Sequence, residues 1–142
     1  LKDGSKKMSK SELSDLSRIN LTDDKDLIIN KIKKAKTDPL PMPNTPKELD
    51  ERLEAKNLLG IYSSLTNSTL EKSVENFAGK NFSEFKQKLS EALVDKIEPI
   101  STEIKKLLDD KSYLDNTLLE GVERANIIAS KKIKRIKEIV GF

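Results

Sequence analysis

The sequence has no cysteine, no histidine and no tryptophan among its 142 residues. The lack of cysteine excludes disulfides, thiol nucleophiles and cysteine-type zinc sites, and the lack of histidine excludes histidine-based triads, general bases and metal ligands. Only four Phe and two Tyr are present, and 35% of the residues are hydrophobic against 36% charged. This composition favours a helical protein with an aliphatic core over a β-sandwich or barrel.

Long apolar runs are missing as well. No stretch approaches the ~18–20 apolar residues of a membrane-spanning helix. Residues 1–10 are polar and basic and do not form a hydrophobic signal segment. Because the sequence starts at Leu1, inside what its composition predicts to be a loop, we expect it to be a fragment of a longer protein.

The net charge of +3 is unevenly distributed along the chain. Residues 1–36 carry a charge of +4, residues 37–119 carry −4 and residues 120–142 carry +3. Basic ends around an acidic middle favour an anionic partner. Solvated helix surfaces would give the same distribution without any partner, so charge alone leaves both interpretations open.

The spacing of apolar residues predicts a first helix over about 23–36, with Ile28, Ile32 and Ala35 on its buried side. Four of the five prolines follow within residues 39–47. Each proline lacks an amide donor and disfavours a helical residue before it. We therefore expect an extended linker there, and we interpret it as the best internal boundary of the chain.

Later helices are predicted by their starts and ends. One begins between Glu48 and Ala55 and runs to about Leu65. Three more begin where a Ser or Asn precedes an acidic residue by three positions, as in a capping box: Ser68 with Glu71, Asn81 with Glu84, and Ser112 with Asp115. Gly79 and Gly141 are the expected stops, and Pro99 is expected to kink or split the helix near residues 95–98. The pattern thus predicts a bundle of four or five helices.

One segment contains residues that could bind a ligand or take part in catalysis: Lys7-Met8-Ser9-Lys10-Ser11, or KMSKS. Two lysines three positions apart, with two serines in a loop, can surround a polyphosphate with ammonium groups and backbone amides. An ordinary basic surface loop would have the same composition, and the five residues alone do not decide between the two.

A second basic cluster lies near the end of the last predicted helix, at Lys131, Lys132, Lys134, Arg135 and Lys137. Such a cluster could neutralise phosphates of a nucleic acid. It would also suit a solvated helix end that stabilises the helix dipole. In both cases Ile133 and Ile136, between the basic residues, are expected to face the core.

Neighbouring carboxylates occur at Asp23 and Asp24 and at Asp109 and Asp110. They fall where helices are expected to begin or end. We therefore interpret them as helix caps or exposed charge, and we predict no metal ligand in this chain.

Six segments match, in sequence and in order, segments of a known protein family. They are Lys7 to Ser11 (KMSKS), Lys31 to Asp38 (KIKKAKTD), Glu54 to Leu65 (EAKNLLGIYSSL), Asn76 to Leu93 (NFAGKNFSEFKQKLSEAL), Glu98 to Ile100 (EPI) and Leu118 to Phe142 (LLEGVERANIIASKKIKRIKEIVGF). The chain resembles the C-terminal half of the bacterial-type tryptophanyl-tRNA synthetases, which are class I aminoacyl-tRNA synthetases. KMSKS alone indicates only class I or a related adenylate-forming transferase, and the later segments favour tryptophan over tyrosine.

The resemblance implies an all-α helical bundle of the anticodon-binding type. A KMSKS loop from the end of a nucleotide-binding α/β domain would precede this bundle, and that domain is missing here. Residues 1–38 would be the KMSKS loop and the following helix, at the end of the catalytic part. Residues 39–47 would be a proline-rich linker, and residues 48–142 a helical tRNA-binding domain.

The resemblance also implies a function, the ATP-dependent joining of tryptophan to its tRNA by the whole protein. Lys10 and Lys7 would be catalytic: Lys10 would stabilise the charge on the departing pyrophosphate, and Lys7 would support the phosphates. Met8, Ser9 and Ser11 would complete the ATP-binding set. Mg²⁺ would be held by the ATP phosphates.

Expected partners are tRNA, contacted through Lys131, Lys132, Lys134 and Arg135, together with ATP, tryptophan and a second copy in a homodimer, all in the cytoplasm and away from membranes. The family's HIGH-like motif needs histidine, so it is not in this sequence, and the tryptophan pocket is missing too; the chain alone is expected to be inactive. Two alternatives stay open: a non-catalytic helical RNA-binding module with a fortuitous KMSKS match, and a structural or dimerising helical domain.

Overall fold

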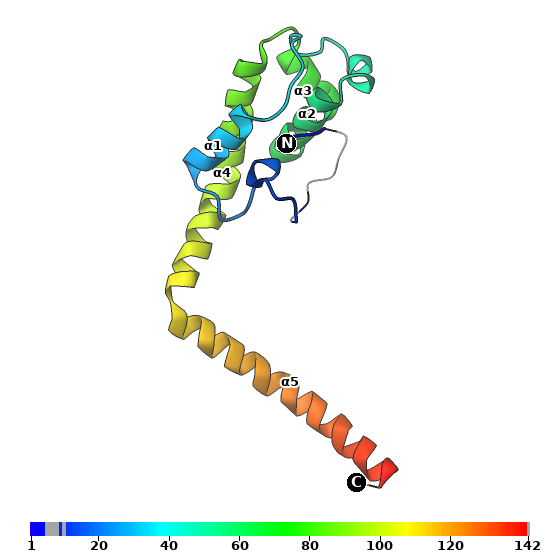
Figure 1. The fold of residues 1–142 in the computed structure, drawn as a ribbon, viewed down its shortest axis with the longest axis vertical. Helices are drawn as coiled ribbons and strands as arrows, with labels where there is room; N and C mark the ends of the chain where they lie inside the picture. Colours follow the sequence, from blue (N-terminus) through cyan, green and yellow to red (C-terminus); the bar gives the residue numbers. More distant parts are fainter. Residues whose placement is uncertain (5–8, 10, 142) are drawn as a thin grey trace. The chain divides into compact units, whose positions relative to one another are not determined.

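The computed structural model describes residues 1–4, 9 and 11–141 of the chain. Every regular element in those residues is helical, which confirms the predicted all-α fold. The chain forms two compact units, residues 1–102 and residues 103–142, which we call the first and the second unit. Figure 1 shows the elements along the chain.

The elements include two short 3-10 turns and five α-helices. They are η1 (Asp15–Ser17), α1 (Lys25–Lys33), η2 (Pro46–Asp50), α2 (Leu53–Thr66), α3 (Leu70–Phe77), α4 (Phe82–Asp109) and α5 (Lys111–Val140). The predicted first helix is confirmed as α1, and it is shorter than expected at both ends. Asp24 caps it, because its carboxylate accepts from the Leu27 amide at 2.9 Å.

The core of the first unit is aliphatic with a small aromatic cluster. Each of α1, α2, α3 and α4 contributes buried side chains at helical spacing. The predicted stripe of Ile28, Ile32 and Ala35 is buried, as expected. The Phe77 and Phe85 rings pack edge to face with centroids 4.9 Å apart, and Tyr62 packs against both.

The proline-rich segment is non-helical as far as Thr45, whereas Pro46 and Lys47, predicted to be extended, form the start of η2; the whole segment is part of the first unit. Met42 and Pro43 are fully buried in that unit. The Met42 amide donates to the Lys80 carbonyl at 2.8 Å, and the Gly79 amide donates to the Met42 carbonyl at 3.2 Å. The two compact units divide after Thr102 instead. The assignment of residues 1–38 and 48–142 to catalytic and tRNA-binding parts concerns function and stays a prediction.

The helix ends differ in detail from the sequence pattern. Thr69, one residue after the predicted Ser68, is the N-cap of α3 and accepts from the Lys72 amide at 3.3 Å. Asp110 and not Ser112 caps α5, where it accepts from the Tyr113 amide at 2.9 Å. The expected stops are confirmed: Gly79 and Gly141 have φ of +69° and +83°, a region that favours glycine.

Pro99 does not split α4, contrary to one of the two predicted outcomes. The helix is continuous from Phe82 to Asp109 with Pro99 inside it. A proline removes only its own backbone donor, whose acceptor would have been the Asp95 carbonyl. Because Asp95 and Pro99 are exposed, water can satisfy that carbonyl.

The prediction that Ile133 and Ile136 face the core is wrong. No residue of α5 is buried, and these two side chains are 54% and 58% exposed. The helical pattern itself is correct, because α5 is continuous across both. An amphipathic pattern identifies the apolar face of a helix but does not show that another element covers it. Within residues 1–4, 9 and 11–141, no helix combines the length and the hydropathy that crossing a membrane requires.

Candidate functional site

The KMSKS segment, residues 7–11, is only partly described. Lys7, Met8 and Lys10 lie outside the described residues. Ser9 and Ser11 are exposed, and their hydroxyl oxygens are 3.0 Å apart, within hydrogen-bonding distance. The Glu12 amide donates to the Ser9 carbonyl at 3.4 Å. A main-chain hydrogen bond therefore links the KMSKS segment to Glu12, the residue that follows it.

Before the segment, Leu1 is fixed by its main chain and its side chain. Its nitrogen donates to the Ser17 carbonyl at 3.0 Å, and its carbonyl accepts from the Lys36 amide at 3.0 Å. Its side chain is buried in the core. Leu1 thus joins the chain before the KMSKS segment to η1, which follows the segment, and to the residues after α1.

Gly4 lies against the start of α2. A Cβ atom on Gly4 would be 2.6 Å from the Leu53 carbonyl oxygen and 2.8 Å from the Glu54 nitrogen. Real Cβ atoms do not approach the main chain so closely, so the contact requires glycine. Nearby, Lys36 pairs with Glu54 at 2.7 Å, and this hydrogen bond lowers the pKa of the Glu54 carboxyl.

After the segment, the chain is held by ion pairs to Lys31, a buried residue of α1. Its side chain is completely buried. The ammonium group lies 2.7 Å from the Asp23 carboxylate, which is itself buried, and 2.6 Å from the Asp15 carboxylate, which is half exposed. A buried ammonium needs such partners, because an unpaired charge is costly to remove from water.

Arg18 and Asn20 extend this cluster toward the KMSKS segment. The Arg18 guanidinium pairs with Asp15 at 3.1 Å and donates to the Glu12 carbonyl at 2.9 Å. The Asn20 amide group donates to Asp15 at 2.9 Å. Hydrogen bonds from Lys31 first and Asn20 second lower the pKa of Asp15.

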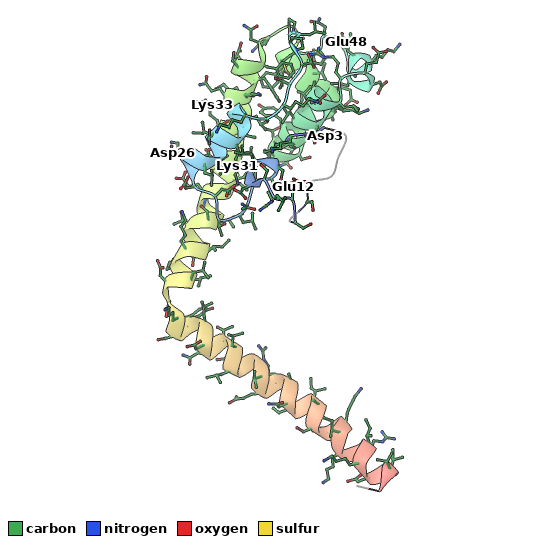
Figure 2. The ribbon with its side chains drawn as sticks, viewed as in Figure 1. Asp3, Glu12, Asp26, Lys31, Lys33 and Glu48 are labelled. Atoms are coloured by element: carbon green, nitrogen blue, oxygen red, sulfur yellow. The ribbon has the colours of Figure 1, made fainter. Side chains whose placement is uncertain are left out.

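We call this set the anchor network: Glu12, Asp15, Arg18, Asn20, Asp23 and Lys31. It links a buried residue of α1 to the carbonyl group directly after Ser11. Lys31 and Glu12, at its two ends, are labelled in Figure 2. The KMSKS segment therefore lies between two fixed points, Leu1 to Gly4 before it and the anchor network after it.

Sequence reasoning missed the anchor network. The sequence predicts that Asp23 caps a helix or is exposed, whereas it is 3% exposed and bonded to Lys31. A signal for Lys31 is present: it lies three residues after Ile28 and next to Ile32, on the buried stripe of the predicted helix. A lysine on an apolar stripe predicts a buried charge that needs an acidic partner.

The four basic residues predicted to contact tRNA lie on α5 and are exposed. At about 100° per residue, Lys131, Lys134 and Arg135 fall on one side of the helix. Ile133 and Ile136 fall on the opposite side. The basic residues on that side are all exposed, in keeping with either interpretation of the sequence.

The described residues also contain a groove of about 750 Å³ between α1 and α4. Lys86 lies in it and donates to the carbonyls of Ala35 at 2.7 Å and Lys33 at 3.1 Å, so it caps the end of α1. Burial lowers the pKa of Lys86. None of the residues predicted to form a site lines this groove. Among the residues that the structure describes, no group of three or more acidic side chains is placed to hold a metal ion.

Comparison with known proteins gives a consistent result. The family described as class I tRNA synthetases (W and Y) matches residues 1–98. Tryptophan–tRNA ligases from Agrobacterium fabrum, Mesorhizobium japonicum and Rickettsia felis are 49%, 47% and 49% identical to the whole chain. The chain spans 40% of the length of the first two relatives and 42% of the third. The KMSKS segment and both of its anchors lie within the matched residues, and the chain belongs to the class I tRNA synthetases of the tryptophan and tyrosine family.

Proposed function

We propose that this chain is the C-terminal part of a tryptophan–tRNA ligase, which activates tryptophan with ATP and transfers it to tRNA. The observation that carries the proposal is the combination of 44–49% identity to tryptophan–tRNA ligases over the whole chain with an intact KMSKS sequence. The fixed points on both sides of that sequence support it, because a phosphate-binding loop must be held close to its substrate.

In this proposal the two lysines of the KMSKS segment act on the ATP phosphates. The tryptophan carboxylate attacks the α-phosphate, and negative charge builds on the departing pyrophosphate. Lys10 stabilises that charge, and Lys7 supports the phosphates. Ser9 and Ser11 offer hydroxyl groups, which are exposed. Mg²⁺ bound to the ATP phosphates would neutralise further charge, and the chain's own residues in this region are lysines and serines, which suit phosphate and not the metal.

Lys131, Lys132, Lys134 and Arg135, all exposed on α5, would contact the tRNA backbone. The whole protein would act as a homodimer in the cytoplasm. The lack of histidine places the family's HIGH-like motif outside this sequence. The adenine and tryptophan pockets would therefore come from the part of the protein that precedes the chain.

The test is ATP–pyrophosphate exchange. The full-length protein that carries this sequence should catalyse exchange with tryptophan and not with tyrosine. The 142-residue chain alone should give a helical circular dichroism spectrum but no exchange. Exchange that depends on tyrosine, or no exchange by the full-length protein with either amino acid, would overturn the proposed function. Exchange by the isolated chain would show that it is not merely a part of the active site.

A further inference from the structure

Asp15 occupies the centre of the anchor network. Its two carboxylate oxygens have different partners: one lies 2.6 Å from the Lys31 ammonium, and the other lies 3.1 Å from the Arg18 guanidinium. Asp15 is thus the one residue of the network that bonds both the buried Lys31 of α1 and Arg18, which donates to the carbonyl next to the KMSKS segment.

Arg18 connects Asp15 to the backbone next to the KMSKS segment through a hydrogen bond. Its second guanidinium nitrogen donates to the Glu12 carbonyl at 2.9 Å, and its Nε donates to the Asn20 side chain at 3.2 Å. A guanidinium bonded on three sides by Asp15, Asn20 and Glu12 has one orientation, because its donors form a rigid fork. Glu12 follows Ser11 directly, so its carbonyl fixes the end of the segment.

We propose that Asp15 is a positioning residue for the KMSKS segment, acting through Arg18 on the Glu12 carbonyl. The inference rests on the proposed function for its chemical consequence. Asp15 does not touch the substrate in this account. It sets where the segment that carries the lysines ends, and so where those lysines meet the phosphates.

The role of Asp15 can be separated from the stability of the fold. Lys31 keeps its second partner, the buried Asp23 at 2.7 Å, when Asp15 is changed. Asp15 itself is 49% exposed, so its replacement does not open a cavity in the core. Asp15→Asn removes both charge pairs while keeping the size of the side chain. Arg18→Met removes only the tie to Glu12 and Asn20 and the pair with Asp15, and leaves Lys31 with both carboxylates.

A matched control is Asp50→Asn. Asp50 is an exposed carboxylate of the same unit that pairs with Lys56 at 3.1 Å, and Lys56 is not part of the anchor network. The control removes one negative charge, as Asp15→Asn does, together with a surface ion pair. Exposed surface pairs of this kind contribute little to folding, because both charges remain largely solvated.

The experiment has two readouts on Asp15→Asn, Arg18→Met and the control. In the 142-residue chain, hydrogen exchange of the amides of residues 11–17 should become faster in both test variants and not in the control, while exchange in α2 and α3 stays the same. In the full-length protein, both test variants should lower kcat for adenylate formation by about 10-fold or more, because a misplacement of about 1 Å can cost about 10²-fold. KM for ATP should stay within about 2-fold, the sign of a contact that matters in the transition state.

Faster exchange with an unchanged kcat would show that the network is structural only and would overturn the inference. Unchanged exchange in residues 11–17 would overturn it as well, because Asp15 would then not hold the chain. An inactive wild-type protein has a different meaning: it contradicts the proposed function, whereas an active wild type with fully active variants contradicts only the role of Asp15.

Discussion

A glycine decides how the chain before the KMSKS segment meets the rest of the first unit. Gly4 has no side chain, and its α-carbon lies so close to the start of α2 that a methyl group would be 2.6 Å from the Leu53 carbonyl oxygen. The φ angle of Gly4 is not in the left-handed region, because only Gly79 and Gly141 among the described glycines are found there. The requirement for glycine at residue 4 is therefore one of space.

Gly4→Ala should destabilise the chain by about 1–3 kcal/mol, the usual cost of forcing an extra carbon into a packed site. Gly60→Ala is the matched control, since Gly60 lies inside α2 and a methyl group added there would have no atom within 4 Å apart from the adjacent backbone of its own helix. Alanine is the better helix former, so this variant should gain about 0.5–1 kcal/mol. Urea unfolding followed by circular dichroism measures both. Equal stability of Gly4→Ala and the wild type would mean that residues 1–4 do not need this contact.

Lys10 gives the sharpest prediction at the residue scale. In the full-length protein, Lys10→Ala should slow adenylate formation by about 10²–10³-fold, or roughly 2.7–4 kcal/mol, by analogy with the removal of one oxyanion donor. ATP binding should change much less, because the charge on pyrophosphate develops only as the bond to the α-phosphate breaks. Lys10→Arg should recover only part of the rate, since a planar fork does not replace a compact ammonium.

Pre-steady-state adenylate formation at saturating ATP is the measurement for Lys10. Lys2→Ala is the control, because Lys2 is an exposed lysine before the KMSKS segment and outside the motif. If Lys10→Ala forms adenylate at the normal rate and only its affinity for ATP falls, Lys10 binds ground-state phosphate and its assigned role is wrong.

At the scale of the elements, the sequence predicts helices better than it predicts their ends and their surroundings. Ile28, Ile32 and Ala35 can be identified because burial recurs with the period of the helix. The N-cap of α3 differs from the prediction by one residue, because Ser68 and Thr69 both offer a hydroxyl and only the fold decides which one reaches the Lys72 amide. The exposure of Ile133 could not be predicted, because it depends on what lies next to the helix.

The candidate site, too, has a part that the sequence predicts and a part that it does not. The KMSKS motif is five consecutive residues and can be recognised in the sequence, whereas the anchor network joins Glu12 to Lys31 through Arg18 and Asp15, whose spacing follows no motif. Pairings of this kind depend on how η1 and α1 meet in space. Lys31 is the exception: its burial can be predicted from the sequence, because it is a charged residue on the apolar side of the predicted helix. Its carboxylate partners could not be chosen from the sequence, because six acidic residues lie in residues 1–36.

The helix α5 carries the prediction about tRNA. Replacing Lys131, Lys132 and Arg135 with Ala in the full-length protein should weaken tRNA binding. The slope of log affinity against log salt should flatten by up to about 0.7–0.9 for each phosphate that the variant no longer neutralises. Adenylate formation should barely change, because the lysines of the KMSKS segment are intact.

The control for the tRNA measurement is Lys72→Ala, an exposed lysine of α3 that is not one of the basic residues of α5. It removes a positive charge without touching the proposed surface. A salt slope that is the same for the triple variant and the wild type would mean that the basic residues of α5 only solvate the helix end and favour its dipole.

At the scale of the whole chain, the part that matches the family and the part that has a core coincide. The buried apolar residues run from Leu1 to Val94, the family match covers residues 1–98, and the first unit ends at Thr102. The matched sequence thus describes a folded body and not only a motif. The KMSKS segment is built into this body at both of its ends, so this part of the site has its own support within a chain that spans 40% of its first relatives' length.

The hydrogen bond between the Leu1 nitrogen and the Ser17 carbonyl closes a loop in the chain, and closing a loop costs conformational entropy. It joins residues that are 16 positions apart, so forming it restricts the intervening residues and costs entropy. That cost grows only with the logarithm of the number of residues, and doubling the span would add about 0.6 kcal/mol. Thermodynamic stability therefore sets almost no limit on the length of the segment between the two fixed points. If the proposed function holds, that length would instead be set by the distance over which Lys7 and Lys10 must reach the ATP phosphates.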